Sequence, residues 1–452
     1  MTDKNEQYTT VLERYEDDPR LNKLGLAYFF TNSEKIQLGC KRLWAYSNMI
    51  GGDKQKTAKA LLYGIAWHLV CEHALNEIKQ TDTMITVERG IELINTVAKR
   101  FLLDEQMNID AFDVFEFIDD CIARLERAIV GWIPHWANNM HNEFEIISVE
   151  QTLCAPVYSW GNFEIDNFTG RQFVGKVQVY KDSKGYMWPL NIYAFSTDFH
   201  DIKNENKTLD IPFYRVGKAD VIVRRRNTKS LYIVDHKTSA SPNGYARKFE
   251  YEQQLASYCA LLQYEIKRGE LQHLKDHKIV GIVWDMAHSK VPTPPKPLKN
   301  GTLSIAKSRL SPSWIFEQAI EINGLDRSAY IDHIEHCKQH ADPSYFKILH
   351  KSISTTDIER SFYEDYATAY KINDLRSDLL SMKLNDNTFQ IIAPRYPICQ
   401  EYQNCSFSHY CQPNTPLSNI DQKKVTKIYW KPLTDNTSCD NLSRDNNFKL
   451  PF

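Results

Sequence analysis

The sequence predicts an α/β domain with helical additions, because helical and β-type hydrophobic patterns occupy separate stretches of the chain. Apolar residues recur at three- and four-residue spacing in three segments near 55–80, 86–103 and 110–141, as in amphipathic helices. Short β-type runs begin near residue 143, and a helix near 247–268 then precedes the apolar strand KIVGIVWDM. This order favours a sheet covered by helices.

The first part of the chain divides into a polar N-terminal tail, residues 1–20, and a helical region, residues 21–142. Ser33 is a candidate N-cap for a helix in EKIQLGCKRLWAYSNMI, because its hydroxyl can accept a hydrogen bond from a backbone amide in the first turn. The three amphipathic segments complete this region.

The predicted core spans residues 143–288 and contains a β-hairpin. A strand near 143–158 is followed by GKADVIVRRR (217–226) and SLYIVDHKT (230–238). The short polar link Asn227-Thr228-Lys229 between these two runs is suited to a hairpin turn.

The C-terminal part consists of a basic Pro-rich insertion with helices, residues 289–396, a cysteine-bearing segment, 397–412, and a polar tail, 413–452. The prolines of PTPPKP oppose regular structure, so we expect a loop or flap near 289–313. Helices are expected near 314–341 and 355–383.

Composition indicates a globular protein without a membrane partner. The 452 residues are 42% hydrophobic and 25% charged, with a formal net charge of −2, so any nucleic-acid surface must be a local patch. No apolar run approaches the roughly 20 residues that span a bilayer, and the N-terminus lacks the apolar core of a signal peptide. Ten cysteines are too sparse for a disulfide scaffold. We therefore expect a cytoplasmic protein.

Two acids on adjacent strands form the most informative constellation. Asp220 lies in GKADVIV, and Asp235 and Lys237 lie in YIVDHKTS. Two neighbouring carboxylates repel each other and favour a cation between them, and oxygen ligands suit Mg²⁺ or Mn²⁺. Lys237 shares a strand face with Asp235, where an ammonium could position water or stabilise charge during attack on a phosphodiester.

The alternative is that both acids are solvated strand ends and that Lys237 is an ordinary surface lysine. A D-x-K triplet alone carries little information. The setting favours a site, because the apolar run LYIV leads directly into the charged triplet.

These segments, followed by Gln254 and Tyr258 in EQQLASYCALL, resemble the motif series of RecB-like PD-(D/E)XK nucleases. The resemblance implies a restriction-endonuclease-like core with a central mixed sheet flanked by helices. It also implies that Asp220 and Asp235 are metal carboxylates, Lys237 the catalytic lysine and the carbonyl of His236 a backbone ligand. Gln254 and Tyr258, four residues apart on one helix face, would lie beside the active site.

The same resemblance extends upstream, where GIAWHLVCEHAL matches a G-x-x-x-H-x-x-x-E pattern at Gly64, His68 and Glu72. It implies that His68 is a further metal ligand, as a neutral imidazole can be. The alternative is a helix histidine satisfied by a hydrogen bond, and the adjacent His73 shows that histidine is not rare here.

Cys399, Cys405 and Cys411 follow a C-x5-C-x5-C spacing, which differs from the C-x2-C pairs of zinc ribbons. With Cys40, in SEKIQLGCKRLWAY, they resemble the cysteine set of iron–sulfur members of this nuclease class. The resemblance implies a structural 4Fe-4S cluster joining the two ends of the core. The late spacing departs from the commonest family pattern, and ordinary thiols or a zinc site remain as alternatives.

Basic residues near the core are candidate phosphate contacts. Arg224, Arg225 and Arg226 end the first strand of the hairpin, and the Pro-rich segment carries four lysines, Lys290, Lys296, Lys299 and Lys307. Such side chains hold phosphates without sequence readout. The alternative is a solvated hairpin tip and a solvated loop. The segment VPTPPKPLKNGTLS also resembles an insertion in phage-borne relatives, which would place the protein in a bacterial or phage-infected cell.

The function implied is a Mg²⁺- or Mn²⁺-dependent deoxyribonuclease. Resemblance to recombination and repair exonucleases implies action on linear or single-stranded DNA ends, with a helicase or recombinase as a possible partner. Two alternatives remain, namely an inactive DNA-binding or assembly module of the same fold and a structure-specific or RNA-directed endonuclease.

Overall fold

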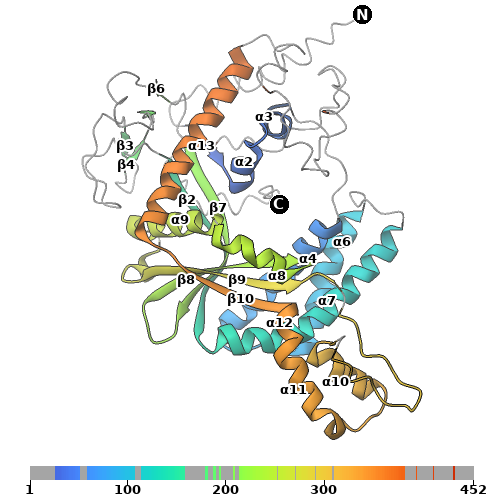
Figure 1. The fold of residues 1–452 in the computed structure, drawn as a ribbon. Helices are drawn as coiled ribbons and strands as arrows, with labels where there is room; N and C mark the ends of the chain where they lie inside the picture. The colour runs from blue at the N-terminus through green and yellow to red at the C-terminus, as the bar shows by residue number, and fades with distance from the viewer. Residues whose placement is uncertain are drawn as a thin grey trace, which may run out of the picture.

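The computed structural model describes most of the core and several short pieces, namely residues 26–50, 59–106, 113–157, 179–181, 187–189, 193–194, 207–208, 213–251, 253–269, 271–290, 292–307, 310–381, 393, 411 and 431–432. A central sheet carries helices on both faces, and a helical lobe extends away from it (Figure 1). No helix among these residues is long and apolar enough to cross a membrane.

The sheet is mixed and has the strand order β10-β9-β8-β7-β1-β11, with β2 also paired to β7. β7 and β8 form the predicted antiparallel hairpin, with Asn227 in the left-handed region at its turn (φ 64°), and β8 runs parallel to β9. The bounds are β1 Leu26–Phe30, β2 Phe144–Val157, β7 Phe213–Arg225, β8 Ser230–Ser239, β9 Lys278–His288, β10 Phe346–Ser352 and β11 Lys431–Pro432. Two further antiparallel pairs join β3 (Val179–Lys181) to β4 (Met187–Pro189) and β5 (Tyr193–Ala194) to β6 (Lys207–Thr208).

One face of the sheet packs against the N-terminal helices, which confirms the three predicted amphipathic segments. These helices are α4 (Lys59–Thr81), α5 (Val87–Leu93), α6 (Lys99–Asp104) and α7 (Val114–Trp136). Their apolar sides meet Val221, Val234 and Val283 of the sheet in one buried cluster, where Trp67 and Trp132 pack edge to face.

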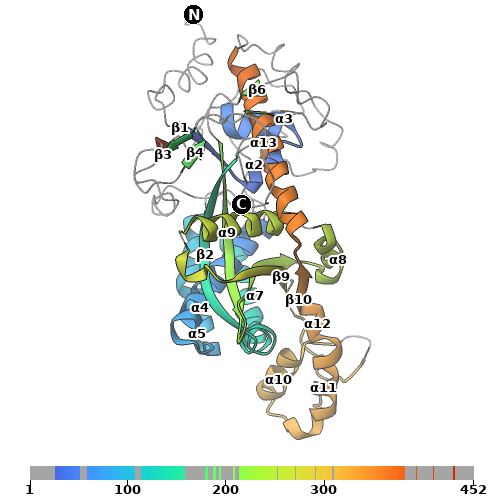
Figure 2. The same ribbon diagram turned by 90° about the vertical axis from the view of Figure 1, so that its left-hand side faces the viewer.

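The opposite face is covered by α9 (Gln254–Arg268), with α13 (Thr355–Ser381) packed beside α9 and α8 (Pro242–Ala246) nearby (Figure 2). The predicted helix near 247–268 thus begins as a short 3₁₀ turn, Arg247–Tyr251, before α9. It ends at Gly269, whose φ of 87° is accessible to glycine.

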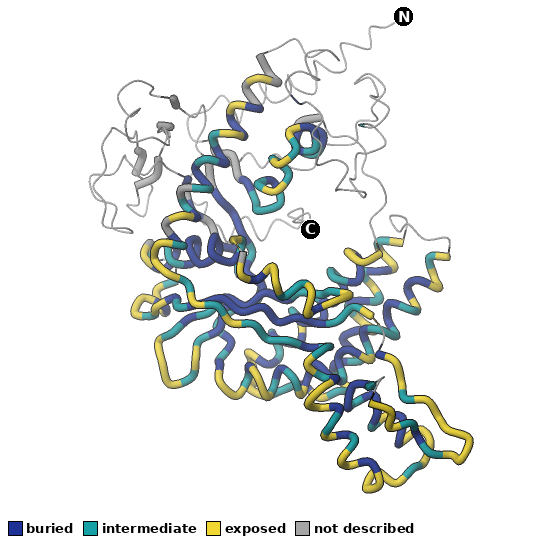
Figure 3. The backbone as a smooth tube through the Cα atoms, in the orientation of Figure 1, coloured by how far each residue is buried: buried dark blue, intermediate teal, exposed yellow. Residues whose placement is uncertain are grey.

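A helical lobe made of α10 (Ser313–Ile322), α11 (Ile331–His340) and the Pro-rich segment 292–307 projects from the core (Figures 1 and 2). Its outer surface is largely exposed, whereas the sheet is buried (Figure 3). Trp314 of the lobe packs closely against α7 at Gly131. A Cβ at this glycine would lie 2.5 Å from the Trp314 ring. A short link, α12 (Asp342–Tyr345), leads from the lobe into β10.

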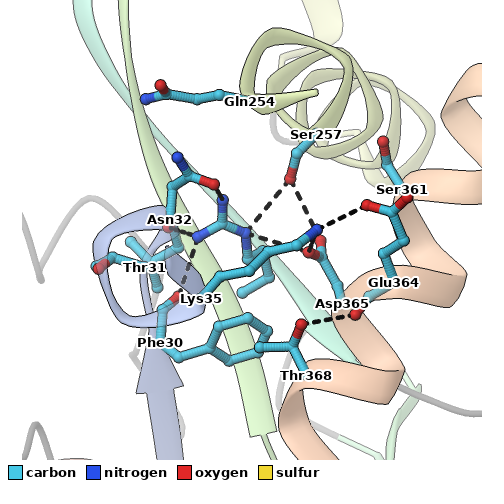
Figure 4. A network of polar contacts seen from close by, with 12 residues as sticks. Phe30, Thr31, Asn32, Lys35, Gln254, Ser257, Ser361, Glu364, Asp365 and Thr368 are labelled. Carbon is cyan, nitrogen blue, oxygen red and sulfur yellow. Dashed lines mark hydrogen bonds and ion pairs between the residues drawn. The ribbon is translucent and has the colours of Figure 1, made fainter. Parts of the chain in front are cut away.

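A buried polar cluster ties the N-terminal segment to the core (Figure 4). Arg215 on β7 donates to the carbonyl of Phe30, which ends β1, and to Ser257 on α9, and its Nε lies 3.5 Å from Asp365 Oδ1 on α13. Lys35, on α2 (Asn32–Gln37), lies 3.6 Å from the same oxygen. Five elements, β1, α2, β7, α9 and α13, therefore meet at one ionic cluster.

Two strands of the central sheet that are longer than two residues, β1 and β10, were not expected from the sequence. β1 lies in the region assigned to helices, and β10 lies between the two C-terminal helical segments. Both are short and are stabilised by pairing with strands far away in the chain, β7 and β9.

Candidate active site

Asp220 and Asp235 come to opposed positions on the β7–β8 hairpin. Val221 pairs with Val234, so the two acids occupy the next opposed position of the ladder. Both are buried, with exposed fractions of 7% and 3%. Hairpin register thus brings two carboxylates from different motifs to one place.

Three further groups contact these acids. His68 on α4 places its Nδ1 3.3 Å from Asp220 Oδ2, and the backbone N–H of His236 donates to the same oxygen at 2.9 Å. Lys237 Nζ lies 2.5 Å from Asp235 Oδ2. The structure therefore gathers the predicted residues His68, Asp220, Asp235 and Lys237 from one helix and two strands.

The pKa values of these groups are displaced in opposite directions. Burial alone would raise the pKa of Asp220, but the charge and hydrogen bond of His68, with the charges of His236 and Lys237, lower it well below its usual range. Burial raises the pKa of Asp235 to about 6, with Lys237 opposing and Asp220 adding to the rise. Burial would lower the pKa of His68, but Asp220 raises it. Divergent values in adjacent acids are typical of functional sites.

The donor set fits a hard divalent cation, because two buried carboxylate groups and an imidazole converge. Within the described ranges, no three His, Cys, Asp or Glu side chains are already arranged to hold a metal ion. Asp235 is instead directed to Lys237. This contact uses Oδ2 of Asp235, so the other carboxylate oxygen could still bind a cation.

Two glycines of the motifs permit close packing around this centre. A Cβ at Gly217 would lie 2.5 Å from the Tyr258 ring, so the glycine lets α9 approach β7. On the other side, a Cβ at Gly64 would lie 3.2 Å from Thr238 Oγ1, next to Lys237. Tyr258 in turn accepts a hydrogen bond from Gln254 at 2.8 Å. Residues of the separate sequence motifs thus pack against one another in the structure.

A family model described as the PD-(D/E)XK nuclease superfamily matches residues 36–412. The chain belongs to the PD-(D/E)XK nuclease superfamily. The predicted fold, a mixed sheet flanked by helices, is confirmed by the strand order and by this match. A search of curated proteins finds no relative that matches the chain.

Sequence reasoning overlooked two acids close to the centre of this PD-(D/E)XK protein. Asp285 of β9 is 1% exposed and hydrogen-bonds to Trp132 and His236. Glu150 of β2 has a φ of 53°, unusual for a non-glycine residue, and forms an ion pair with Lys218. A charge within the apolar run KIVGIVWDM was the available signal for Asp285.

The two ends of the superfamily match meet near Cys40 and Cys411. Cys40 is the N-cap of α3 (Lys41–Ala45), and Arg42 in that helix places its Nη1 3.8 Å from Cys411 Sγ. Arg42 also donates to the carbonyl of Ala393 at 2.8 Å. Cys399 and Cys405 lie outside the described residues.

The three arginines of this nuclease-family hairpin are already paired with acids. Arg224 pairs with Glu145, Arg225 with Glu143 at 3.2 Å, and Arg226 with Asp82 at 2.6 Å. A phosphate would compete with these carboxylates for the guanidinium groups.

The lysines of the Pro-rich segment are differently placed. Lys296 and Lys299 are exposed beside a small turn closed by the bridge between Pro297 and Leu303. The same segment contains no helix or strand within 292–307, in agreement with the predicted loop.

Proposed function

We propose that this protein is a Mg²⁺- or Mn²⁺-dependent deoxyribonuclease that hydrolyses phosphodiester bonds from DNA ends. The observation that carries the proposal is the meeting of Asp220, Asp235, Lys237 and His68 in a buried centre of a PD-(D/E)XK fold. Superfamily membership supports a metal-dependent nuclease, and end-directed action rests on resemblance to recombination and repair exonucleases.

His68, Asp220, Asp235 and the His236 carbonyl would hold the cation, which supplies Lewis-acid activation of the phosphate when bound. Lys237 keeps an ammonium beside Asp235, where it can orient the attacking water and stabilise charge on phosphate oxygens. The hydrogen-bonded pair of Gln254 and Tyr258 lies on α9 at the same centre and would position the DNA strand.

Lys296 and Lys299 are proposed phosphate contacts, because both are exposed on a loop rich in basic residues. The arginines 224–226 are weaker candidates for this role, since each is engaged by a carboxylate. A helicase or recombinase that supplies DNA ends, in the cytoplasm of a bacterial or phage-infected cell, fits such an activity.

We also propose that Cys40, Cys399, Cys405 and Cys411 hold a structural 4Fe-4S cluster. The contact between Arg42 and Cys411 supports this proposal, because it brings the helix capped by Cys40 beside one of the late cysteines. Anaerobically purified protein should then absorb broadly near ~400 nm, and Cys40→Ser should lose this band. A colourless protein that contains zinc would favour the zinc alternative.

The activity is tested with end-labelled linear DNA and closed circular DNA, each with Mg²⁺, with Mn²⁺ or with EDTA. Degradation of linear DNA alone, dependent on the metal, would establish an exonuclease. Cutting of the circle would instead indicate an endonuclease. DNA binding without cleavage in either metal would favour the inactive module, against which the presence of Asp220, Asp235 and Lys237 argues.

A further inference from the structure

A third buried carboxylate near the centre lies on the strand next to the one that carries Asp235 and Lys237. Asp285 on β9 pairs in parallel register with His236 on β8, and its side chain is 1% exposed. His236 and Asp285 lie on the sheet face that packs against α7, because Val234 and Val283, two residues earlier on each strand, belong to the cluster with α7. Asp285 therefore belongs to the protein interior and faces no substrate.

The partners of Asp285 are specific. Its Oδ2 accepts a hydrogen bond from Trp132 Nε1 at 2.8 Å and lies 2.9 Å from His236 Nδ1. His135 Nε2 lies 4.0 Å from the other oxygen. A buried carboxylate is costly unless it is hydrogen-bonded, so this geometry must offset a large desolvation penalty. Burial would raise the pKa of Asp285, but the hydrogen bond and charge of His236, with His135 and Trp132, lower it.

The carboxylate also fixes the orientation of the His236 ring. An ionised carboxylate only accepts hydrogen bonds, so Nδ1 of His236 must donate to it. The other ring nitrogen, Nε2, is buried without a hydrogen-bond partner among the described residues. The ring packs against Trp136 and His68, with centroids 5.6 and 6.0 Å away. The contact with Asp285 is thus the one polar restraint on this ring within the described chain.

The main chain of His236 connects this restraint to the centre. Its N–H donates to Asp220 Oδ2 at 2.9 Å, while Asp235 and Lys237 are its two neighbours along the strand. The ring that Asp285 restrains therefore belongs to the residue whose amide holds Asp220 and whose neighbours are Asp235 and Lys237.

We propose that Asp285 is a positioning residue that holds His236, and through it the 235–237 peptide, in the geometry that the reaction requires. The inference rests on the proposed function and extends it by a residue that touches neither the substrate nor the reacting atoms. A displacement of about 1 Å in such a centre costs roughly 100-fold in rate.

Asp285→Leu removes the acceptor while it keeps a side chain branched at Cγ, and Asp285→Asn keeps an oxygen that can accept from His236. We expect Asp285→Leu to lower kcat about 100-fold with the KM for DNA unchanged, and Asp285→Asn to retain most of the activity. Asp342→Leu is the matched control, because Asp342 is likewise a doubly hydrogen-bonded carboxylate, but it is only partly buried and binds Ser313 in the helical lobe. All assays are run below the melting temperature of each variant.

A second readout does not require turnover. Mn²⁺ should raise the melting temperature of the wild type and of Asp342→Leu, and this rise should shrink in Asp285→Leu. The proposal is overturned if Asp285→Leu keeps both the wild-type kcat and the wild-type Mn²⁺ shift, or if Asp342→Leu loses as much of both. A wild type that fails to cleave DNA would refute the proposed function, while the Mn²⁺ shifts would still decide the role of Asp285.

Discussion

Two carboxylates of this protein, Asp285 and Asp365, are almost completely buried but stabilised in different ways. Asp285 is held by hydrogen bonds from Trp132 and His236, at 2.8 and 2.9 Å. Asp365 has more formal charge around it, since Arg215 and Lys35 lie 3.5 and 3.6 Å away.

The pKa shifts of the two acids are nevertheless opposite. Burial raises the pKa of Asp365, with Arg215 and Lys35 opposing the rise, whereas the partners of Asp285 overcome burial and lower its pKa. The short hydrogen bonds to Asp285 act together with the charges of His236 and His135, whereas the longer contacts of Arg215 and Lys35 do not offset the burial of Asp365. Asp285 lies on β9 next to β8, and the cluster around Asp365 joins β1, α2, β7, α9 and α13.

The largest effect on stability is expected at the Asp365 cluster. Arg215→Met should lower the free energy of unfolding by about 3–5 kcal/mol, because it breaks a buried ion pair and leaves Asp365 with Lys35 and the Ser257 hydroxyl. Urea denaturation measures this loss. An unchanged unfolding midpoint would show that the cluster contributes no net stability, and Lys35→Met, at the half-exposed edge, should cost less.

Glu150 is a third, largely buried acid, and its ion pair with Lys218 does not cancel the pKa rise that burial causes. Burial and the charge of Asp220 raise its pKa from 4.5 to about 7, although Lys218 opposes the rise. The folded state thus binds this proton more tightly than the unfolded state. The free energy of unfolding therefore falls as the pH rises from about 4.5 to 7. Above that window the whole loss of stability, on the order of 3 kcal/mol, remains.

Glu150→Gln should remove this part of the pH dependence. In EDTA, the variant should gain stability relative to the wild type at pH 8 but not at pH 4.5, as measured by urea unfolding at each pH. Asp235, whose pKa is raised to about 6, titrates in the same window, so some slope should remain. Identical slopes in the two proteins would contradict the assignment to Glu150.

A smaller loss is expected on the Asp285 side. Trp132→Phe removes one donor and leaves the bond to His236, and it should cost about 1–3 kcal/mol. Thermal unfolding of the variant tests this value. A loss as large as that of Arg215→Met would mean that the two clusters are energetically equivalent, contrary to the comparison.

The smallest effects are expected at surface charges. Arg226→Ala breaks an exposed ion pair with Asp82 and should change stability by less than about 1 kcal/mol.

A Lys296→Ala, Lys299→Ala double variant should weaken DNA binding and reduce the slope of log affinity against log salt by about 2. Fluorescence anisotropy over a salt series measures both the DNA affinity and this slope. A loss of DNA affinity in Arg226→Ala, with the affinity of the double lysine variant unchanged, would instead place DNA at the arginines.

The sequence predicted the parts of the site that depend on local spacing. The D-x-K triplet and the hairpin register determine which side chains meet, so Asp220, Asp235 and Lys237 could be placed together in advance. The helix that carries His68 was also recognisable from its own pattern.

Other features depend on partners that are distant in the chain. Arg224 was read as a phosphate contact because nothing local indicates that Glu145 lies on the neighbouring strand. Asp285 was overlooked for the same reason, since its donors come from α7 and β8. β10 and β1 form only through pairing with β9 and β7, and short strands carry little pattern of their own.

The central claim is that the acids on the hairpin, and not merely buried acids in general, carry out DNA hydrolysis. The most direct measurement compares cleavage of end-labelled DNA in Mg²⁺ by the wild type, by Asp235→Asn and by Asp365→Asn. We expect Asp235→Asn to lose about 1,000-fold in rate, as several kcal/mol of transition-state stabilisation are removed, and Asp365→Asn to stay near the wild type. Cleavage by Asp235→Asn at the wild-type rate would contradict the account.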